Sequence, residues 1–446
     1  MMQTIDLRGR DLSTSELRAT LPRPELDVTE ALEGATSLIR DVWERGESAL
    51  LEQAERFDRA RPERIRAERA EIDRAVAELD GEVRAALEEM IARVRKGSAA
   101  QVPPPVRTEL APGAVIEQRW EPVERVGLYV PGGKAVYPSS VVMNVVSAQA
   151  AGVRSIAIAS PPQAEFGGAV HPTILAAAGL LGVHEVYAMG GAGAVGALAH
   201  GVASLGLEPV DVVTGPGNVW VAAAKRAVSS VVGIDAEAGP TEVLIIADGT
   251  ADVELVAADL LGQAEHDELA SAVLVTDDAA FAGRVDEAVE RITGATKHRD
   301  RAEASLRGRQ SALVLVDDLA EAARVSNAYG PEHLEIQTAD DESVLAGITS
   351  AGAIFMGPYS PVPLGDYIAG SNHVLPTGGQ AIHSSGLGAH TFLRAQQVIR
   401  YDRAALDAVR GHVRAIAVAE DLPAHADGVD ARYGEGPAAA RSDTGN

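Results

Sequence analysis

The densest cluster of polar side chains in the sequence runs from Gly262 to Glu268 and reads Gly-Gln-Ala-Glu-His-Asp-Glu. The residues before it repeat their apolar side chains at helical spacing, so the cluster lies at the end of a predicted helix. Gln263 and His266 are three residues apart and share one face of that helix, which suits the chelation of a metal ion. A solvent-exposed acidic helix end would explain the carboxylates equally well, and the residues alone leave both interpretations open.

A carboxylate and an imidazole are adjacent at Glu332 and His333, in a segment that begins with Gly330-Pro331 and leads into a predicted strand. Adjacent side chains point in different directions, so the pair would act on two different protons rather than on each other. The pair therefore indicates a general acid-base site, although Glu-His pairs also occur on ordinary protein surfaces.

Two more pairs of a carboxylate and an imidazole lie further along the chain. Asp366 and His373 belong to a long loop, residues 365–376, and long loops inside compact domains are often functional. Glu420 and His425 lie near the C-terminus, where the end of a surface helix explains them as well as a site does. The sequence contains no cysteine, so any metal site must use nitrogen and oxygen ligands.

Glycine-rich turns follow three predicted strands, at residues 130–133, 190–196 and 214–218. Glycine lets main-chain N–H groups approach a phosphate closely, and a helix that begins behind the turn adds a partial positive charge. The segment from Gly191 to Gly196 also matches the dinucleotide-binding pattern G-x-G-x-x-G, but no acidic residue ends the next strand as that pattern requires. Close packing of a helix on a strand would explain these glycines too. Three such turns together favour an anionic cofactor.

The elements that must position these residues indicate an α/β protein. Residues 28–95 predict helices, and from Val126 onward short β-branched runs alternate with alanine-rich helical stretches. Strands that are apolar throughout are typical of parallel sheets covered on both faces. We expect two Rossmann-like, doubly wound domains, with a crossing near Ala238 and small helical or extended segments at the N- and C-termini. Ligands in such sheets bind beyond the carboxyl ends of the strands.

Composition narrows the class of protein further. A length of 446 residues predicts two or three domains, and the lack of cysteine excludes a disulfide scaffold. With 39 Lys and Arg against 64 Asp and Glu, the net charge of −25 repels nucleic acid and anionic lipid. No secretory signal is visible at the start, and the long uncharged run at 186–207 is rich in glycine, which favours a buried strand and helix over a membrane span. We expect a cytoplasmic protein.

Six segments together resemble the histidinol dehydrogenase family: VGLYVPGGKAVYPSSVVMNV, GPGNVWVAAAKR, GIDAEAGPTEVLIIAD, GQAEHDE, GPEHLEIQT and GDYIAGSNHVLPTGG. The resemblance covers nearly the whole chain, and the order and spacing of the segments are hard to obtain by chance. It implies an enzyme that uses zinc and NAD to oxidise L-histidinol through L-histidinaldehyde to L-histidine, the last step of histidine biosynthesis. The reaction consumes two NAD and one water.

The resemblance also implies roles for individual residues. One Zn²⁺ per subunit would be held by Gln263, His266, Asp366 and His425. His333 would take the alcohol proton, and Glu332 would activate the water that adds to the aldehyde. NAD would be contacted by Tyr129 and Asn218, and at Gly193, where the family has a glutamine. The substrate-binding residues would be Thr241, Gln263, His266, His333, Asp366, His373, Glu420 and His425.

The family is dimeric, which implies a homodimer whose C-terminal tail brings Glu420 and His425 into the other subunit's site. The expected domains are an N-terminal arm (1–25), a metal- and substrate-binding domain (26–125 with 240–382), an NAD-binding domain (126–239), a C-terminal helical tail (383–435) and a disordered terminus (436–446). The missing glutamine at Gly193 implies weaker NAD binding with the chemistry retained. It leaves two alternatives: a relative that oxidises another amino or sulfonated alcohol, and a zinc-dependent binding protein without turnover.

Overall fold

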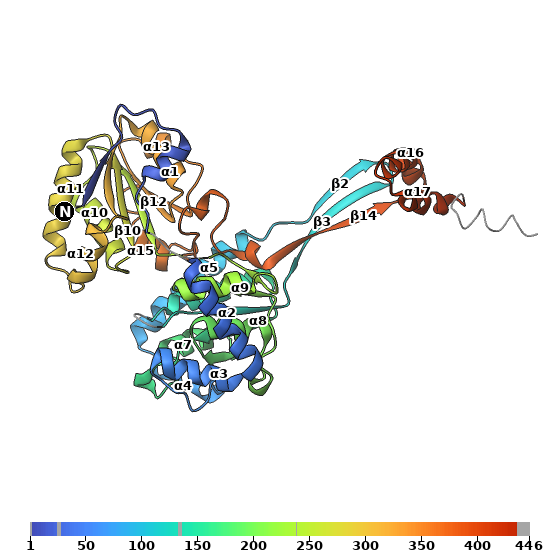
Figure 1. The fold of residues 1–446 in the computed structure, drawn as a ribbon, viewed down its shortest axis with the longest axis horizontal. Helices are drawn as coiled ribbons and strands as arrows, with labels where there is room; N and C mark the ends of the chain where they lie inside the picture. Colours follow the sequence, from blue (N-terminus) through green and yellow to red (C-terminus); the bar gives the residue numbers. More distant parts are fainter. Residues whose placement is uncertain (1, 25–27, 133–135, 238, 435–446) are drawn as a thin grey trace, which may run out of the picture. The chain divides into compact units, whose positions relative to one another are not determined.

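The computed structural model describes residues 2–24, 28–132, 136–237 and 239–434, and the chain forms two compact units (Figure 1). The first unit comprises Met1–Val102 and Pro122–Phe392, and the second comprises Pro103–Glu121 and Leu393–Asn446. Three predictions fall outside the described residues: Gly133 of the first glycine turn, Ala238 at the crossing, and the disordered terminus 436–446.

The first unit contains a five-stranded parallel sheet in the order β6-β5-β4-β7-β8. The chain starts in the centre, runs outward through β5 and β6, and then crosses to the other side of β4 to form β7. Neighbouring loops therefore diverge between β4 and β7, which is the switch point of a doubly wound sheet. The strands are β4 (Arg125–Tyr129), β5 (Ser155–Ser160), β6 (Val186–Ala188), β7 (Val212–Thr214) and β8 (Gly233–Ile234). The intervening helices are α6 (Pro138–Ala151), α7 (Pro172–Leu180), α8 (Gly191–His200) and α9 (Val219–Val228).

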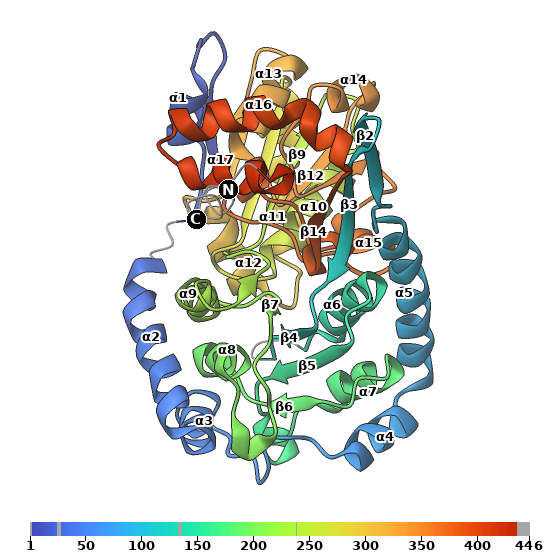
Figure 2. The same cartoon turned by 90° about the vertical axis from the view of Figure 1, so that its right-hand side faces the viewer.

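The N-terminal helices form a further layer on this sheet (Figure 2). They are α2 (Val28–Arg45), α3 (Glu47–Gln53), the π-helical turn η1 (Ala54–Asp58), α4 (Arg69–Glu78) and α5 (Gly81–Ala100). Helix α2 packs on α8 and α9, α4 on α7, and α5 on α6. The sequence analysis grouped residues 26–125 with 240–382, and the structure corrects this. The reason is close packing: Gly196 has no side chain, and a Cβ there would lie 3.1 Å from Ile39 of α2.

A second sheet in the same unit has six parallel strands in the order β1-β11-β10-β9-β12-β13. They are β1 (Gln3–Asp6), β9 (Glu242–Ala247), β10 (Ser271–Thr276), β11 (Ala312–Leu315), β12 (His333–Gln337) and β13 (Ala353–Met356). Strands β9 and β10 are buried along their whole length, because helices cover both faces of the sheet. The N-terminal arm is part of this sheet rather than a separate segment, since β1 pairs with β11. The α/β fold with parallel sheets is confirmed.

The helices around the second sheet are α1 (Thr14–Thr20), α10 (Val253–Ala264), α11 (Ala279–Thr293), α12 (Arg299–Arg307), α13 (Leu319–Tyr329), α14 (Asp341–Leu345) and α15 (Val362–Tyr367). Short 3₁₀ turns of the unit are η2 (Ala164–Phe166), η3 (Ala203–Leu205), η4 (Gln380–Ile382) and η5 (Ala389–Phe392). The uncharged run 186–207 forms β6, α8 and η3, as predicted. None of the helices that the structure describes is long and apolar enough to cross a bilayer.

The second unit is a three-stranded sheet with two helices. Its strands, in the order β14-β3-β2, are β2 (Val106–Ala111), β3 (Ala114–Pro122) and β14 (Leu393–Tyr401), followed by α16 (Arg403–Ala419), α17 (Pro423–Asp430) and η6 (Ala431–Tyr433). The predicted helical tail, residues 383–435, thus contains the strand β14 before its two helices. Asp430 accepts a hydrogen bond from Arg410 at 2.8 Å and pairs with Arg414, which fastens α17 to α16.

Candidate active site at the amino ends of two strands

The predicted catalytic residues gather where β9 and β12 begin. Thr241 precedes β9, Glu332 precedes β12, and His333 is the first residue of β12. The register pairs His333 with Val243, so these amino ends lie side by side in the sheet. We expected ligands beyond the carboxyl ends of the strands, whereas these predicted site residues of the second sheet lie at the amino ends. The polar groups here come from the loops that enter the strands.

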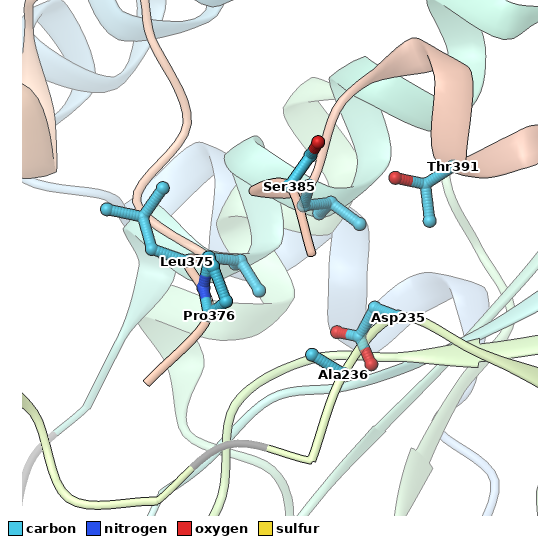
Figure 3. Close-up of a pocket in the computed structure, with 8 residues that line it drawn as sticks. Asp235, Ala236, Leu375, Pro376, Ser385 and Thr391 are labelled. Carbon is cyan, nitrogen blue, oxygen red and sulfur yellow. The ribbon is translucent and has the colours of Figure 1, made fainter. Parts of the chain in front are cut away.

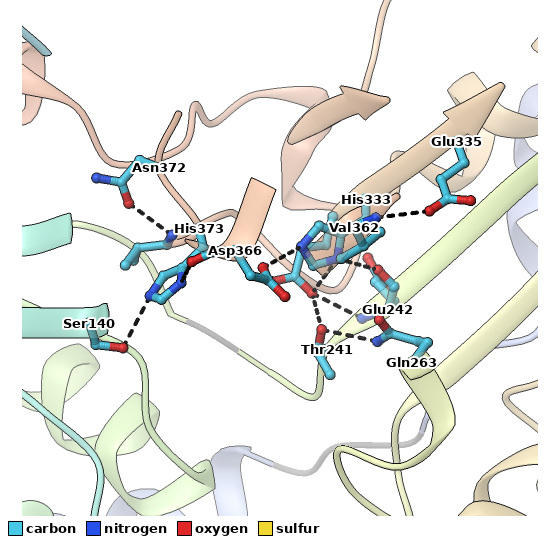
Figure 4. Close-up of polar contacts among 12 residues, drawn as sticks. Ser140, Thr241, Glu242, Gln263, His333, Glu335, Val362, Asp366, Asn372 and His373 are labelled. Carbon is cyan, nitrogen blue, oxygen red and sulfur yellow. Dashed lines mark hydrogen bonds and ion pairs between the residues drawn. The ribbon is translucent and has the colours of Figure 1, made fainter. Parts of the chain in front are cut away.

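Glu332 is held by two hydrogen bonds, from Thr241 and Glu242, which are both labelled in Figure 4. Its Oε2 accepts from Thr241 Oγ1 at 2.7 Å and from the main-chain nitrogen of Glu242 at 2.9 Å. Burial raises the pKa of Glu332 above its ordinary value, although the neighbouring His333 and both hydrogen bonds act in the opposite direction. A carboxylate with a raised pKa takes a proton more readily near neutral pH, so Glu332 has the properties of a general base.

His333 is 4% exposed, and its surroundings determine which nitrogen carries the proton. Nδ1 lies 3.0 Å from the carbonyl oxygen of Glu242, which can only accept a hydrogen bond, so Nδ1 is the donor. Nε2 of the neutral ring then carries a lone pair, and it has no hydrogen-bond partner in the part of the chain that the structure describes. The same nitrogen lies 4.0 Å from Asp366 Oδ1. A buried, unpaired lone pair is available to take a proton from a ligand.

His373 is fixed in the same way. Its Nδ1 lies 2.9 Å from the carbonyl oxygen of Asp366 and therefore donates, while Ser140 Oγ lies 3.1 Å from Nε2 and donates to it. Burial lowers the pKa of His373, which favours the neutral ring. Ser140 belongs to the first turn of α6, the helix that follows β4 along the chain. This contact ties α6 of the first sheet to the segment after α15 that carries His373.

Gln263 lies in the last turn of α10, and His266 lies in the loop between α10 and β10. Gln263 is buried, and its Nε2 donates to Thr241 Oγ1 at 3.0 Å, so its carbonyl oxygen is the atom left for a ligand. A charge on His266 or on His333 lowers the pKa of His373, which places both rings in the electrostatic surroundings of this site. An amide oxygen, an imidazole and the Asp366 carboxylate form a donor set that fits Zn²⁺.

Within the described ranges, no three His, Asp or Glu side chains come together closely enough to hold a metal ion. Of the four predicted ligands, Gln263 is an amide and His425 belongs to the second unit. This leaves His266 and Asp366 as the His or Asp ligands of the first unit. The structure therefore does not assemble the predicted four-ligand set within one unit, and that set remains a prediction.

The predicted cofactor residues lie at the carboxyl edge of the first sheet. Tyr129 ends β4, and its hydroxyl accepts a hydrogen bond from the main-chain nitrogen of Gly191 at 3.2 Å. Burial raises the pKa of Tyr129 to about 12. Asn218 caps α9, since its Oδ1 accepts from the nitrogens of Trp220 and Val221 at 3.0 and 3.3 Å. These residues flank the switch point between β4 and β7.

The glycine turn before Asn218 is held by a buried ion pair of Lys225 and Asp235. Lys225 Nζ donates to the carbonyl oxygen of Gly215 at 3.0 Å, and Gly215 donates its N–H to Asp235 Oδ2 at 2.8 Å. Gly215 has φ = 117°, a conformation that favours glycine. A small cavity beside this turn is lined by Asp235, Leu375 and Ser385, among others (Figure 3).

Gly193 faces the protein interior. A Cβ at this position would lie 2.1 Å from Oε1 of Gln53 on α3. Gly193 and Gly196 thus allow close packing toward α3 and α2, which favours the packing interpretation for these two glycines. A Cβ at Gly191 would meet no atom within 4 Å, and its φ of 59° favours glycine instead. Gly127 of β4 makes the corresponding close approach to α8, since a Cβ there would lie 2.9 Å from Leu198.

Comparison with known proteins identifies the family, because the family model of histidinol dehydrogenase matches residues 21–433. The chain belongs to the histidinol dehydrogenase family. The histidinol dehydrogenase of Leifsonia xyli subsp. xyli is 65% identical over 434 residues, which are 97% of this chain and 100% of that protein. That of Nocardia farcinica is 58% identical over 96% of this chain and 97% of its own length. The crystal structure of histidinol dehydrogenase from Elizabethkingia anophelis matches with a TM-score of 0.90 at 32% identity, and covers 97% of this chain and 98% of that one.

Membership of the histidinol dehydrogenase family confirms the resemblance and shows that the chain is an enzyme. Glu420 and His425, which that resemblance implies as site residues, belong to the second unit. Glu420 follows α16, His425 lies on α17, and both are exposed within their unit. The structure does not bring them together with Gln263 or Asp366 in one unit, and their part in a site remains a prediction.

Four further polar residues at or near the site were not expected from the sequence. Ser140, Glu242 and Glu335 lie within the histidinol dehydrogenase motifs, and Asp259 lies between two of them. Ser140 was hidden at the start of an apolar helix. Glu335 follows His333 by two residues in the predicted strand, and this spacing puts both on one face. Glu242 and Asp259 gave no signal in the sequence, because their partners are distant along the chain.

Proposed function

We propose that this enzyme oxidises L-histidinol through L-histidinaldehyde to L-histidine with two NAD, as the last step of histidine biosynthesis. One observation carries the proposal: the buried, unpaired Nε2 of His333 lies beside the hydrogen-bonded carboxyl of Glu332, at the amino ends of β9 and β12. Two successive oxidations at one carbon need two different proton acceptors, and this site offers two.

His333 is the base of the first oxidation in this proposal. Its Nε2 takes the proton of the substrate alcohol, which converts the ring into an imidazolium ion. Asp366 Oδ1 at 4.0 Å and Glu332 Oε2 at 3.6 Å from the ring nitrogens are the negative charges that stabilise this ion. The Nδ1 bond to the carbonyl of Glu242 holds the ring in place through the transfer.

Glu332 is the base of the second oxidation. It removes a proton from the water that adds to the aldehyde, and its raised pKa matches that task. Thr241 and the main-chain N–H of Glu242 fix the carboxylate, while Gln263 fixes Thr241 in turn. Thr241 and the neutral ring of His373 also supply polar contacts to the substrate.

We assign Gln263, His266 and Asp366, with His425 of the partner subunit, as the residues that would hold a zinc ion. When bound, zinc would orient the amino and imidazole groups of the substrate, and NAD would accept the hydride at each oxidation. The bond from Gln263 Nε2 to Thr241 uses the amide nitrogen and not the amide oxygen, which supports this assignment. Tyr129 and Asn218 are the proposed NAD contacts, and the switch point between β4 and β7 supports this location. The close packing of Gly193 against Gln53 does not support a further contact there.

The active enzyme in this proposal is a homodimer in which Glu420 and His425 act in the site of the partner subunit. Its support is the surface of the second unit, where large apolar side chains are exposed beside these residues along the chain. They include Ile416, Val418 and Leu422. Exposed apolar groups of this kind are typical of protein interfaces.

The test is the stoichiometry of NADH formed from histidinol by the zinc-loaded enzyme, with the product identified by mass spectrometry. Two NADH and one histidine per histidinol are expected. NADH formed only from another alcohol would identify a relative with a different substrate. Zinc-dependent ligand binding without NADH would identify a binding protein, and either result would refute the proposal.

A further inference from the structure

A cluster of buried polar side chains lies behind the candidate active site and takes no part in the proposed chemistry. Glu335 and Gln337 of β12 are 1% and 5% exposed, and Asp259 of α10 is partly buried. Gln337 Nε2 donates to Glu335 Oε2 at 3.1 Å and to Asp259 Oδ2 at 3.2 Å. The side-chain amide of Gln337 thus bridges the two carboxyl groups. We call these three residues the acid cluster.

Burial raises the pKa of Asp259 and of Glu335, and the negative charge of Asp259 raises that of Glu335 further. Among the described residues, no Lys or Arg forms an ion pair with either carboxyl group to offset its charge. The bridging amide of Gln337 is therefore a polar contact that joins α10 to β12 at this buried position.

The acid cluster joins the three elements that present the site residues. Asp259 and Gln263 are four residues apart on α10, and so lie on one face of that helix. Glu335 follows His333 by two residues on β12, and so lies on the same face of the strand. Glu335 Oε1 accepts a hydrogen bond at 3.1 Å from the main-chain nitrogen of Val362, the first residue of α15.

Helix α15 completes the pattern, because it carries Asp366 four residues after Val362. Each of the three elements thus contributes to one hydrogen-bonded network: Asp259 from α10, Glu335 and Gln337 from β12, and the Val362 N–H from α15. Each also contributes one residue to the site: Gln263 from α10, His333 from β12 and Asp366 from α15.

We propose that Asp259 and Glu335 are positioning residues, which through their hydrogen bonds to Gln337 and to the main chain of Val362 fix α10, β12 and α15 so that Gln263, His333 and Asp366 face a common ligand. This inference rests on the proposed function for the identity of the ligands, zinc and histidinol. It goes beyond that function by assigning the acid cluster the task of holding the site together.

The proposal is tested by pairs of variants at each position. Glu335→Gln keeps the shape, accepts from Val362 and can hydrogen-bond to the Gln337 amide, whereas Glu335→Ala removes both bonds. Asp259→Asn and Asp259→Ala form a second pair at a less buried position, in case Glu335→Ala fails to fold. Ile336→Val is the control, because it reduces packing on the opposite face of the same strand, where Ile336 is buried.

Three properties are measured. The first is the dissociation constant for Zn²⁺ added to the metal-free protein, the second is KM and kcat for histidinol, and the third is the rate of hydrogen exchange of the main-chain amides of α15. The alanine variants are expected to weaken zinc binding and to raise KM by about 10-fold or more, with a smaller effect on kcat. They should also speed exchange in α15. The amide variants should stay within about 2-fold of wild type, and Ile336→Val should leave all three measurements unchanged.

Alanine variants with wild-type zinc affinity, KM and α15 exchange would overturn the proposal, as would amide variants as impaired as the alanine variants. If the wild-type enzyme itself bound neither zinc nor histidinol, the proposed function would fail instead. Exchange in α15 would still decide the inference in that case, because it needs no ligand.

Discussion

Glu242 offers a quantitative test of how the N-terminal arm supports the site. Its side chain is buried and pairs with Arg23 at 3.2 Å, while its main chain bonds both Glu332 and His333. Burial raises the pKa of Glu242 from 4.5 to about 7. The folded protein therefore keeps a proton on Glu242 between pH 4.5 and 7, which the unfolded chain releases.

The consequence is a loss of stability as the pH rises through this window. At 1.36 kcal/mol per pH unit, the Glu242 contribution falls by about 3 kcal/mol between pH 4.5 and 7 and then levels off. Glu242→Gln has no proton to release, so its unfolding free energy lacks this decline. Relative to wild type, the variant should become more stable with rising pH by about that amount.

Scanning calorimetry of wild type and Glu242→Gln at pH 5, 6, 7 and 8 measures the effect. The expected result is a difference in Tm that moves steadily in favour of the variant up to about pH 7. Glu63→Gln changes an exposed glutamate and should leave the pH dependence as in wild type. Parallel Tm curves for wild type and Glu242→Gln would refute the reasoning.

Three further outcomes are expected. Thr241→Ala removes the hydroxyl that links Gln263 to Glu332, and it should lower kcat/KM for histidinol by an amount equivalent to about 1–2 kcal/mol of activation free energy. Thr241→Ser keeps the hydroxyl and should keep the wild-type kcat/KM. Equal loss in both variants would contradict the role of the hydroxyl. Removing zinc with a chelator should abolish histidinol binding measured by calorimetry, and reloading should restore it; equal binding by both forms would contradict the metal assignment. A mixture of His425→Ala and His266→Ala chains should recover activity through hybrid dimers, and no recovery under verified subunit exchange would contradict the shared site.

Much of the fold could be predicted from sequence because its strands carry a strong local signal. The segments at 242–247 and 271–276 are apolar and fully buried, as expected for parallel strands covered on both faces. The partner of the N-terminal helices could not be predicted. An amphipathic helix such as α2 shows that it packs on something, but the choice of α8 depends on the close approach of Gly196 to Ile39.

The types of the candidate site residues could be predicted from the sequence better than their location in the fold. The spacing of Gln263 and His266 indicated metal binding, and the adjacency of Glu332 and His333 indicated acid-base catalysis. Polar loops, however, lie at the amino ends of strands as well as at their carboxyl ends. The sequence therefore could not show that the amino edge of the second sheet carries the site. The acid cluster was hidden because Asp259 and Glu335 are 76 positions apart and come together only through the folded sheet, where Gln337 bridges them.

The central claim is that His333 and Glu332 serve two successive steps at one carbon. A single turnover of zinc-loaded Glu332→Gln with histidinol and excess NAD tests it most directly. The account predicts one NADH per site, with histidinaldehyde rather than histidine as the product, while wild type forms two NADH and histidine. Two NADH from Glu332→Gln at the wild-type rate, or none at all from a folded and zinc-loaded variant, would contradict it.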